Sequence, residues 1–293
     1  MKVLVICVFP PVQFPEADHA FSICQRLAGQ GLKLSIITNK GSIVLNRPNV
    51  TQYSVMENWT WREMPRLAKF IRRCSPDRIL LYFIGHLYNE HPMITFAPAI
   101  ARAVFVDVPF VTLLSYAIGA SPSKFPFLSR AFHRGIRLSL KRASNYWYGN
   151  LLHDSKHVIV LSGHNQKALS EHLPEIDQKL ILIPPAPIIL IAPDEEAVRQ
   201  AGREMLGATS DHFLLVYFGY LYPVKGVETL LRAFQMASAR EATLQLALVG
   251  DTFDSDESRN YAQMLRNLTE ELGIGDKVKF TGKFAGDSLE AST

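Results

Sequence analysis

A loop with two glycines and a lysine, residues 219–226, holds the residue types in this sequence best suited to chemistry. It follows an all-apolar hexamer, Phe213 to Phe218, and contains Gly219, Lys225 and Gly226. Apolar residues recur at helical spacing after it, so we expect a buried strand, a short loop and a helix. Such a loop lets backbone N–H groups and an ammonium converge on a phosphate at a helix N-terminus. An ordinary strand-to-helix turn with a solvated lysine explains the spacing equally well.

Strands rich in β-branched residues alternate with helical stretches along the whole chain. Apolar strands separated by helices predict a parallel sheet covered on both faces. The prolines between Ile183 and Pro187 can continue neither a central strand nor a helix, so they mark a boundary. We predict an α/β protein with two doubly wound Rossmann-type domains, residues 1–190 and 191–293. The expected strands are Val3–Val8, Leu34–Thr38, Val50–Val55, Arg78–Phe83, Pro109–Leu114, His157–Leu161, Phe213–Phe218, Leu244–Val249 and Lys277–Thr281.

The second domain has only three expected strands, and the sequence stops soon after the last one. A three-stranded parallel sheet of this kind leaves a bare edge and an open face for helix packing. We therefore expect either that the chain is a fragment or that a partner covers this edge.

Composition indicates a globular protein of a reducing compartment. Apolar residues make up 48% of the chain, enough for a sizeable core. Cys7, Cys24 and Cys74 have no metal-ligand or redox-motif spacing, so we interpret them as buried thiols. The apolar start is short and runs into prolines, as in a first strand rather than a signal peptide. The apolar region from Met93 to Leu114 is too interrupted to span a membrane. From these observations we expect the protein to be cytoplasmic.

The net charge of +4 is concentrated in one segment, because no acidic residue lies between Val108 and His153. Four cations there fall on one stripe of a predicted helix, and apolar residues lie mostly elsewhere on its circumference. A basic amphipathic helix can lie on an anionic membrane surface, at the inner face of the membrane. A solvated basic face of an ordinary helix is an equal alternative. No motif for nucleic-acid binding accompanies the charges. The cations of this stripe are Arg130, Arg134, Arg137 and Lys141.

Landmarks in matching order resemble family-4 retaining glycosyltransferases of the GT-B architecture. Phe218-Gly219 with Lys225-Gly226 and Ala233-Phe234 is similar to the family's donor-binding motif. Pro10-Pro11 and Asp18-His19 resemble its first strand–loop–helix. The likeness covers essentially the whole chain, and it implies two Rossmann-type domains that face a cleft.

The resemblance implies a role for particular residues. Lys225 would meet the diphosphate of a nucleotide-sugar, where its charge stabilises the leaving group without a metal or cofactor. The first domain would hold the acceptor. The donor-side residues are Gly219, Tyr220, Gly226, Gly250, Lys283 and Phe284, and the acceptor-side residues are Glu16, His19, His86, Ser115 and Tyr116.

Several positions depart from the family pattern. Tyr220 stands where an arginine is usual, and Glu16 lies in a first loop that normally carries glycines. Ser115 and Tyr116 replace a histidine found in many members. The pair of glutamates that holds the donor sugar in the family is missing, so we expect a truncated donor pocket.

Other polar groups have equally good structural explanations. His86 and His91 follow a strand where open α/β sheets bind ligands, but a surface loop explains them as well. Asp18 would cap the first helix. No third ligand supports a metal site.

From these residues we predict a hexosyltransferase that uses a nucleotide-sugar donor and a glycan or lipid-linked acceptor, with retention. The alternative is a non-catalytic GT-B remnant that acts as a binding or scaffold protein. A GT-B nucleotide-sugar epimerase fits the order of landmarks less well.

Overall fold

The computed structural model describes residues 1–12, 14–105, 108–116, 135, 148–185, 196–252 and 256–282. The chain forms two compact units, Met1–Ile188 and Ile189–Thr293. The basic stripe of Arg130, Arg134, Arg137 and Lys141 lies outside the described residues, as do Lys283 and Phe284.

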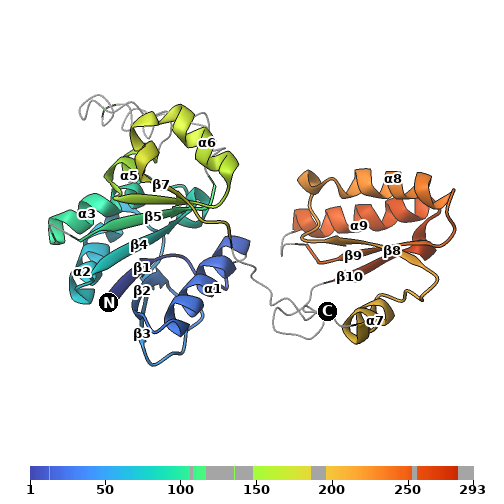
Figure 1. Cartoon of the computed structure of the whole chain (residues 1–293), viewed down its shortest axis with the longest axis horizontal. Helices are drawn as coiled ribbons and strands as arrows, with labels where there is room; N and C mark the ends of the chain where they lie inside the picture. Colours follow the sequence, from blue (N-terminus) through green and yellow to red (C-terminus); the bar gives the residue numbers. More distant parts are fainter. Residues whose placement is uncertain are drawn as a thin grey trace. The chain divides into compact units, whose positions relative to one another are not determined.

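Unit 1 is built on a parallel sheet of seven strands in the order β3-β2-β1-β4-β5-β6-β7 (Figure 1). The order reverses at β1, and right-handed crossovers then place α1 and α3 on opposite faces of the sheet. Its strands are β1 (Lys2–Ile6), β2 (Lys33–Asn39), β3 (Val50–Met56), β4 (Arg78–Phe83), β5 (Phe110–Leu114), β6 (His157–Val160) and β7 (Leu180–Leu182). Its helices are α1 (Pro15–Gly29), α2 (Met64–Cys74), α3 (Ala97–Val104), α5 (Gly149–Asp154) and α6 (Gly163–His172), with short 3-10 turns η1 (Trp61–Glu63), η2 (Gly85–Tyr88), η3 (Pro92–Phe96) and η5 (Pro174–Lys179).

The core of unit 1 lies around its central strands. Residues Val3 to Ile6 of β1 are all buried, and β2 and β4 pair with the strand on its two sides. Cys7 and Cys24 are buried as expected, whereas Cys74 is half-buried at the end of α2.

The described residues of unit 2 form a parallel sheet of three strands in the order β10-β9-β8. Its strands are β8 (Phe213–Phe218), β9 (Leu244–Val249) and β10 (Val278–Gly282). Its helices are α7 (Glu196–Met205), α8 (Val227–Ser238) and α9 (Asp256–Glu271), with 3-10 turns η6 (Pro223–Lys225) and η7 (Gly275–Lys277).

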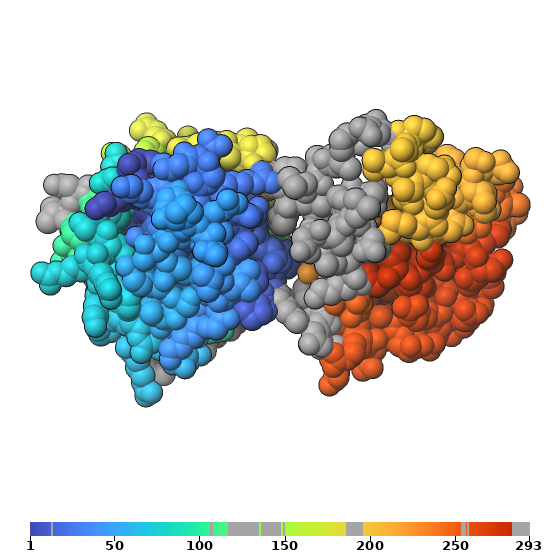
Figure 2. All heavy atoms as spheres, turned by 90° about the horizontal axis from the view of Figure 1, so that it is seen from below, coloured from blue at the N-terminus to red at the C-terminus, as the bar shows by residue number. Residues whose placement is uncertain are grey.

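The helices of unit 2 cover its sheet unequally. The apolar sides of α8 and α9 pack on one face, where Leu231, Phe234 and Leu265 form a core with β9. In Figure 1, α7 lies on the other side of the sheet. The ammonium of Lys279 on β10 donates to the carbonyl of Met205 at the end of α7. The space-filling view accordingly shows α7, in gold, beside red atoms of the last elements (Figure 2).

Three local expectations differ from the structure. β8 was expected to be buried, but it is an edge strand of the small sheet, and Phe213, Val216 and Phe218 are 63%, 53% and 66% exposed. Asp18 does not cap α1, because the helix begins earlier, at Pro15. The residues Leu180–Leu182 pair with β6 as a seventh strand that the sequence did not predict.

Candidate functional site

The loop after β8 is held by backbone contacts. Gly219 has φ +143°, and Gly226 has φ +69°, in the left-handed region where a side chain is strained. The hydroxyl of Tyr217 donates to the carbonyl of Tyr220 at 2.9 Å, and the N–H of Leu221 donates to the carbonyl of Asp251 at 3.0 Å. The loop therefore has a defined shape.

The loop ends at the N-terminus of α8. Gly226 is the N-cap of this helix and has no side chain to accept from the first-turn N–H groups. Those donors and the partial positive charge of the helix end suit an anion. Lys225, one residue earlier, is exposed, and its ammonium lies 5.4 Å from the centre of the Tyr222 ring. The ammonium therefore lies over an aromatic face, on a residue next to the N-cap of α8.

Glycines occupy the carboxyl ends of the three strands described in unit 2. Gly250, with φ +135°, packs so closely on Gly219 that a Cβ on Gly250 would overlap the Gly219 carbonyl. Gly282 and Gly250 form an isolated antiparallel β-bridge. The N–H of Gly250 also donates to the Thr281 hydroxyl at 3.2 Å. Sequence reasoning identified Gly219 and Gly250 but missed Gly282, for which a glycine directly after a β-rich segment was the available signal. Together these glycines expose peptide groups where a bulky ligand can approach closely.

A second cluster lies in unit 1, at the carboxyl ends of β1 and β4. The sheet order reverses between these two strands, and open α/β sheets bind ligands at such a point. Glu16 comes from the first turn of α1, and His86 comes from η2 after β4. Their Oε2 and Nε2 atoms are 3.6 Å apart, which is an ion-pair distance. The ring of Phe14 lies against that of His86, with centroids 4.6 Å apart.

The contact with His86 is the main cause that lowers the pKa of the Glu16 carboxyl, although burial opposes it. The carboxylate is therefore charged at neutral pH, where it can accept hydrogen bonds from a ligand.

Beneath this pair lies a buried polar group. The Nδ1 atom of His19 is 3.0 Å from the hydroxyl of Tyr82 on β4. Burial, with a smaller effect of the Arg26 charge, lowers the pKa of His19, so the ring is neutral at pH 7. Burial raises the pKa of Tyr82 to about 12, against the effect of a hydrogen bond with Ser115. The hydroxyl of Tyr82 stays protonated and links His19 to Ser115.

The structure thus brings four of the five predicted acceptor-side residues into one cluster, and Tyr116 follows Ser115 at an exposed position. Tyr82 and Phe14 were missed. A tyrosine within a buried strand needs a partner for its hydroxyl, and this was the signal for Tyr82.

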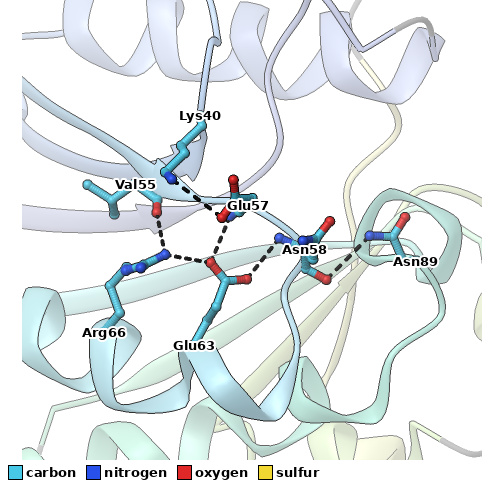
Figure 3. Close-up of polar contacts among 7 residues, drawn as sticks. All are labelled: Lys40, Val55, Glu57, Asn58, Glu63, Arg66 and Asn89. Carbon is cyan, nitrogen blue, oxygen red and sulfur yellow. Dashed lines mark hydrogen bonds and ion pairs between the residues drawn. The ribbon is translucent and has the colours of Figure 1, made fainter.

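The loop between β3 and α2 borders this edge of the sheet (Figure 3). The carboxylate of Glu63, only 7% exposed, accepts hydrogen bonds from the N–H groups of Glu57 and Asn58, both at 2.8 Å. It also pairs with Arg66 at 2.7 Å. The amide of Asn89 donates to the Asn58 carbonyl at 3.3 Å, which ties this loop to the one after β4.

Burial by itself would raise the pKa of the Glu63 carboxyl. Hydrogen bonds from the backbone N–H groups of residues 57–60 together outweigh this effect, so the net shift is downward. Sequence reasoning missed Glu63, since nothing in its spacing distinguished it from a surface glutamate.

Neither a metal site nor a membrane span emerges from the described residues. No group of three or more His, Cys, Asp and Glu side chains among them could hold a metal ion. Within the same part of the chain, every helix is too short or too polar to cross a bilayer.

One family model matches the part of the chain that contains the donor-side loop. Residues 198–291 match the model of the family described as "Glycosyl transferases group 1". This match covers unit 2 from α7 onward, including Lys225, and supports the expectation of a transferase. Among curated proteins, none matches the chain.

Solved structures of glycosyltransferases match nearly the whole chain. HepE of Anabaena, solved in complex with UDP, is 17% identical with a TM-score of 0.66, and the match covers 99% of this chain and 71% of HepE. Sucrose-phosphate synthase of Thermosynechococcus elongatus is 15% identical with a TM-score of 0.63, over 99% of this chain and 72% of the synthase. WaaG, a glycosyltransferase involved in lipopolysaccharide biosynthesis, is also 15% identical, with a TM-score of 0.60 and the same coverage. At such identities the likeness shows the fold, and the GT-B-like fold class predicted from the sequence is confirmed.

Proposed function

We propose that the chain is a retaining glycosyltransferase of the family-4 kind that moves a hexose from a nucleotide-sugar to an acceptor. The observation that carries this proposal is the loop of unit 2, where Lys225 and Gly226 lead into the N-terminus of α8. A diphosphate needs positive charge and N–H donors at its oxygens, and this loop supplies both. HepE, a structure of the same fold, has been solved with UDP and with UDP and glucose.

Lys225 has the main electrostatic role in this proposal. Cleavage of the sugar–phosphate bond builds negative charge on the departing diphosphate, and a fixed ammonium stabilises that charge as it grows. The N–H groups of the first turn of α8 add to this effect, so the leaving group needs no metal in this mechanism. Gly219, Gly250 and Gly282 let the donor approach the backbone closely.

The acceptor binds at the edge of unit 1 in this proposal. The Glu16 carboxylate accepts hydrogen bonds from hydroxyl groups, and the His86 ring can accept or donate them. The exposed ring of Phe14 can cover an apolar sugar face. His19, Tyr82 and Ser115 lie beneath and hold the surface in place. A glycan, or the sugar of a lipid-linked molecule, has both the hydroxyl groups and the apolar face that this surface can bind.

The donor half is tested by calorimetry with UDP, GDP and ADP. We expect the wild type to bind at least one of them, and Lys225→Ala to bind it about tenfold more weakly, the loss of about 1.4 kcal/mol. Arg232→Ala is the matched control, because it removes a cation from the exposed side of α8. Equal affinity in the wild type and Lys225→Ala removes Lys225 from the mechanism.

Turnover separates the enzyme from its rival. Transfer of labelled hexose to a glycan or lipid-linked acceptor supports the enzyme. Nucleotide binding without transfer or donor hydrolysis favours the alternative of a non-catalytic remnant with a binding or scaffold role.

We also propose a peripheral membrane position at the cytoplasmic face, on the sequence evidence of Arg130, Arg134, Arg137 and Lys141. Flotation with liposomes tests it. Binding should need anionic lipid and should weaken when two of these arginines are replaced by glutamine. Flotation independent of anionic lipid contradicts the electrostatic part of the proposal.

A further inference from the structure

The end of β9 lies directly beside the donor-side loop. The N–H of Gly219 donates to the carbonyl of Val249, the last residue of β9, at 3.0 Å. The N–H of Leu221 donates to the carbonyl of Asp251, also at 3.0 Å, so the loop follows β9 beyond the end of the strand. Gly250, between these two acceptors, has no side chain. The carboxylate of Asp251 is therefore the first side chain after β9 at this edge of the sheet.

The next residue holds one oxygen of this carboxylate. The Oδ1 atom of Asp251 accepts a hydrogen bond from the N–H of Thr252 at 2.7 Å, and the Thr252 hydroxyl lies 3.5 Å from the same oxygen. Among the described residues, none donates a hydrogen bond to Oδ2. The side chain is half-buried. Because each carboxylate oxygen can accept about two hydrogen bonds, the group can accept further donors from a ligand.

The position of Asp251 in the topology indicates which donors these are. β8 and β9 pair in parallel and α8 connects them, so the three elements form one βαβ unit. In nucleotide-binding units of this kind the phosphates lie at the N-terminus of the helix, and an acidic residue farther along the unit hydrogen-bonds the ribose. Asp251 follows the second strand of this unit, and its carbonyl is bonded to the loop that leads to α8.

A carboxylate beside a diphosphate site needs an explanation, because the two negative charges repel each other. A carboxylate binds hydrogen-bond donors, and the 2′- and 3′-hydroxyls of ribose are donors that every ribonucleotide carries close to its phosphates. The alternative explanation is local: Asp251 only shapes the turn after β9 through its contact with Thr252. The two explanations differ in one respect, since only a ribose contact makes nucleotide affinity depend on the hydroxyls of the sugar.

We propose that Asp251 selects ribonucleotides over deoxyribonucleotides, because its Oδ2 atom accepts a hydrogen bond from a ribose hydroxyl. This inference rests on the donor site of the proposed function and adds a specificity-determining residue to it. Thr252 holds Oδ1, so the other oxygen is the one that the ribose hydroxyl reaches. A deoxynucleotide lacks that hydroxyl but keeps the repulsion between its phosphates and the carboxylate. It therefore binds more weakly.

Calorimetry of the full chain tests this inference with UDP, GDP and ADP and with the 2′-deoxy and 3′-deoxy counterpart of each. Asp251→Ala is the informative variant. Asp211→Ala is the matched control, because it removes the same charge from an exposed residue before β8, at the opposite end of that strand. Asp251→Asn is a second variant that keeps an oxygen for the N–H of Thr252. Circular dichroism verifies that all three variants fold.

The wild type and Asp211→Ala should bind a ribonucleotide at least about tenfold more tightly than one of its deoxy counterparts, and Asp251→Ala should bind the two within about twofold. Asp251→Asn should lower the preference at least about threefold, since a neutral oxygen is the weaker acceptor. A wild type without this preference, or an Asp251→Ala variant that retains it, overturns the inference. A variant that binds all nucleotides equally more weakly retains the preference and supports the local explanation instead. A wild type that binds no nucleotide overturns the proposed donor site, and the inference with it.

Discussion

At the carboxyl edge of the first sheet the reachable groups are side chains, among them Glu16, His86 and Phe14, whereas at that edge of the second sheet three glycines present the peptide backbone. In the first sheet β1 has a strand on each side. The polar groups at its carboxyl edge lie near the buried pair of His19 and Tyr82. The second edge is formed by backbone packed on backbone, because Gly250 lies directly against the Gly219 carbonyl. A recognition surface made of side chains can vary with its ligand, while one made of peptide groups suits a constant group such as a diphosphate.

The largest effect is expected at the contact between strand ends in unit 2. Gly250→Ala must adopt a φ of +135° and push a methyl group into the Gly219 carbonyl. We expect unit 2 to lose about 3 kcal/mol or more of unfolding free energy. Denaturant unfolding followed by circular dichroism measures it. Gly29→Ala, at the end of α1 with open space around the site, should leave stability unchanged within about 1 kcal/mol. Similar stability of the two variants would contradict the backbone contact.

The next effect contrasts two glutamates of one loop in unit 1. Glu63→Gln replaces a buried carboxylate that accepts several backbone hydrogen bonds, so we expect a loss of about 2 kcal/mol. Glu57→Gln removes an exposed ion pair with Lys40, 3.4 Å long, and should cost less than about 0.5 kcal/mol. Chemical denaturation of both variants at neutral pH gives the comparison. A larger loss for Glu57→Gln would mean that Glu57, and not Glu63, is the glutamate that stabilises this loop.

The stability difference between the wild type and Glu63→Gln should depend on pH. The pKa of Glu63 is lower in the folded protein than in the unfolded chain, so its stabilising effect is fully present above the unfolded pKa of a glutamate, about 4.3. The effect is lost as the pH falls through the folded pKa. Thermal unfolding of both proteins from neutral to acid pH should show two curves that converge. Curves that stay parallel throughout would mean that the carboxylate charge contributes nothing.

The smallest effect concerns the buried pair beneath the acceptor-side surface. Tyr82→Phe removes the hydroxyl that lies 3.0 Å from His19, and we expect a loss of about 1 kcal/mol. A double-mutant cycle with His19→Phe isolates the interaction. If the two single losses simply add, the hydroxyl and the ring do not stabilise each other.

The fold was predictable because its signals are local and repeated. The alternation of apolar strands such as Arg78–Phe83 with helices fixes a parallel α/β architecture, and the resemblance added the GT-B class. The position of a strand within its sheet was harder to predict. An apolar run such as Phe213–Phe218 is the same sequence in the centre or at an edge, and only the strand order places it at an edge.

Within the candidate sites, residues at strand ends were predictable and residues that support them were not. His86 follows a predicted strand, where ligands usually bind, so its position marked it, whereas the resemblance marked Glu16 and His19. Glu63 acts through backbone N–H groups of a loop whose shape the sequence did not reveal. β7 escaped prediction because three residues beside a proline cluster give no periodic signal.

The contact of Gly219 with Gly250 has a consequence for how the donor-side surface is studied. Alanine scanning reports what side chains contribute, and at these positions there are none to remove. Replacing single peptide bonds with esters by chemical ligation deletes one N–H at a time, without adding atoms. Ester substitution at the first turn of α8 would therefore test whether individual N–H groups bind an anion, which side-chain mutagenesis does not address.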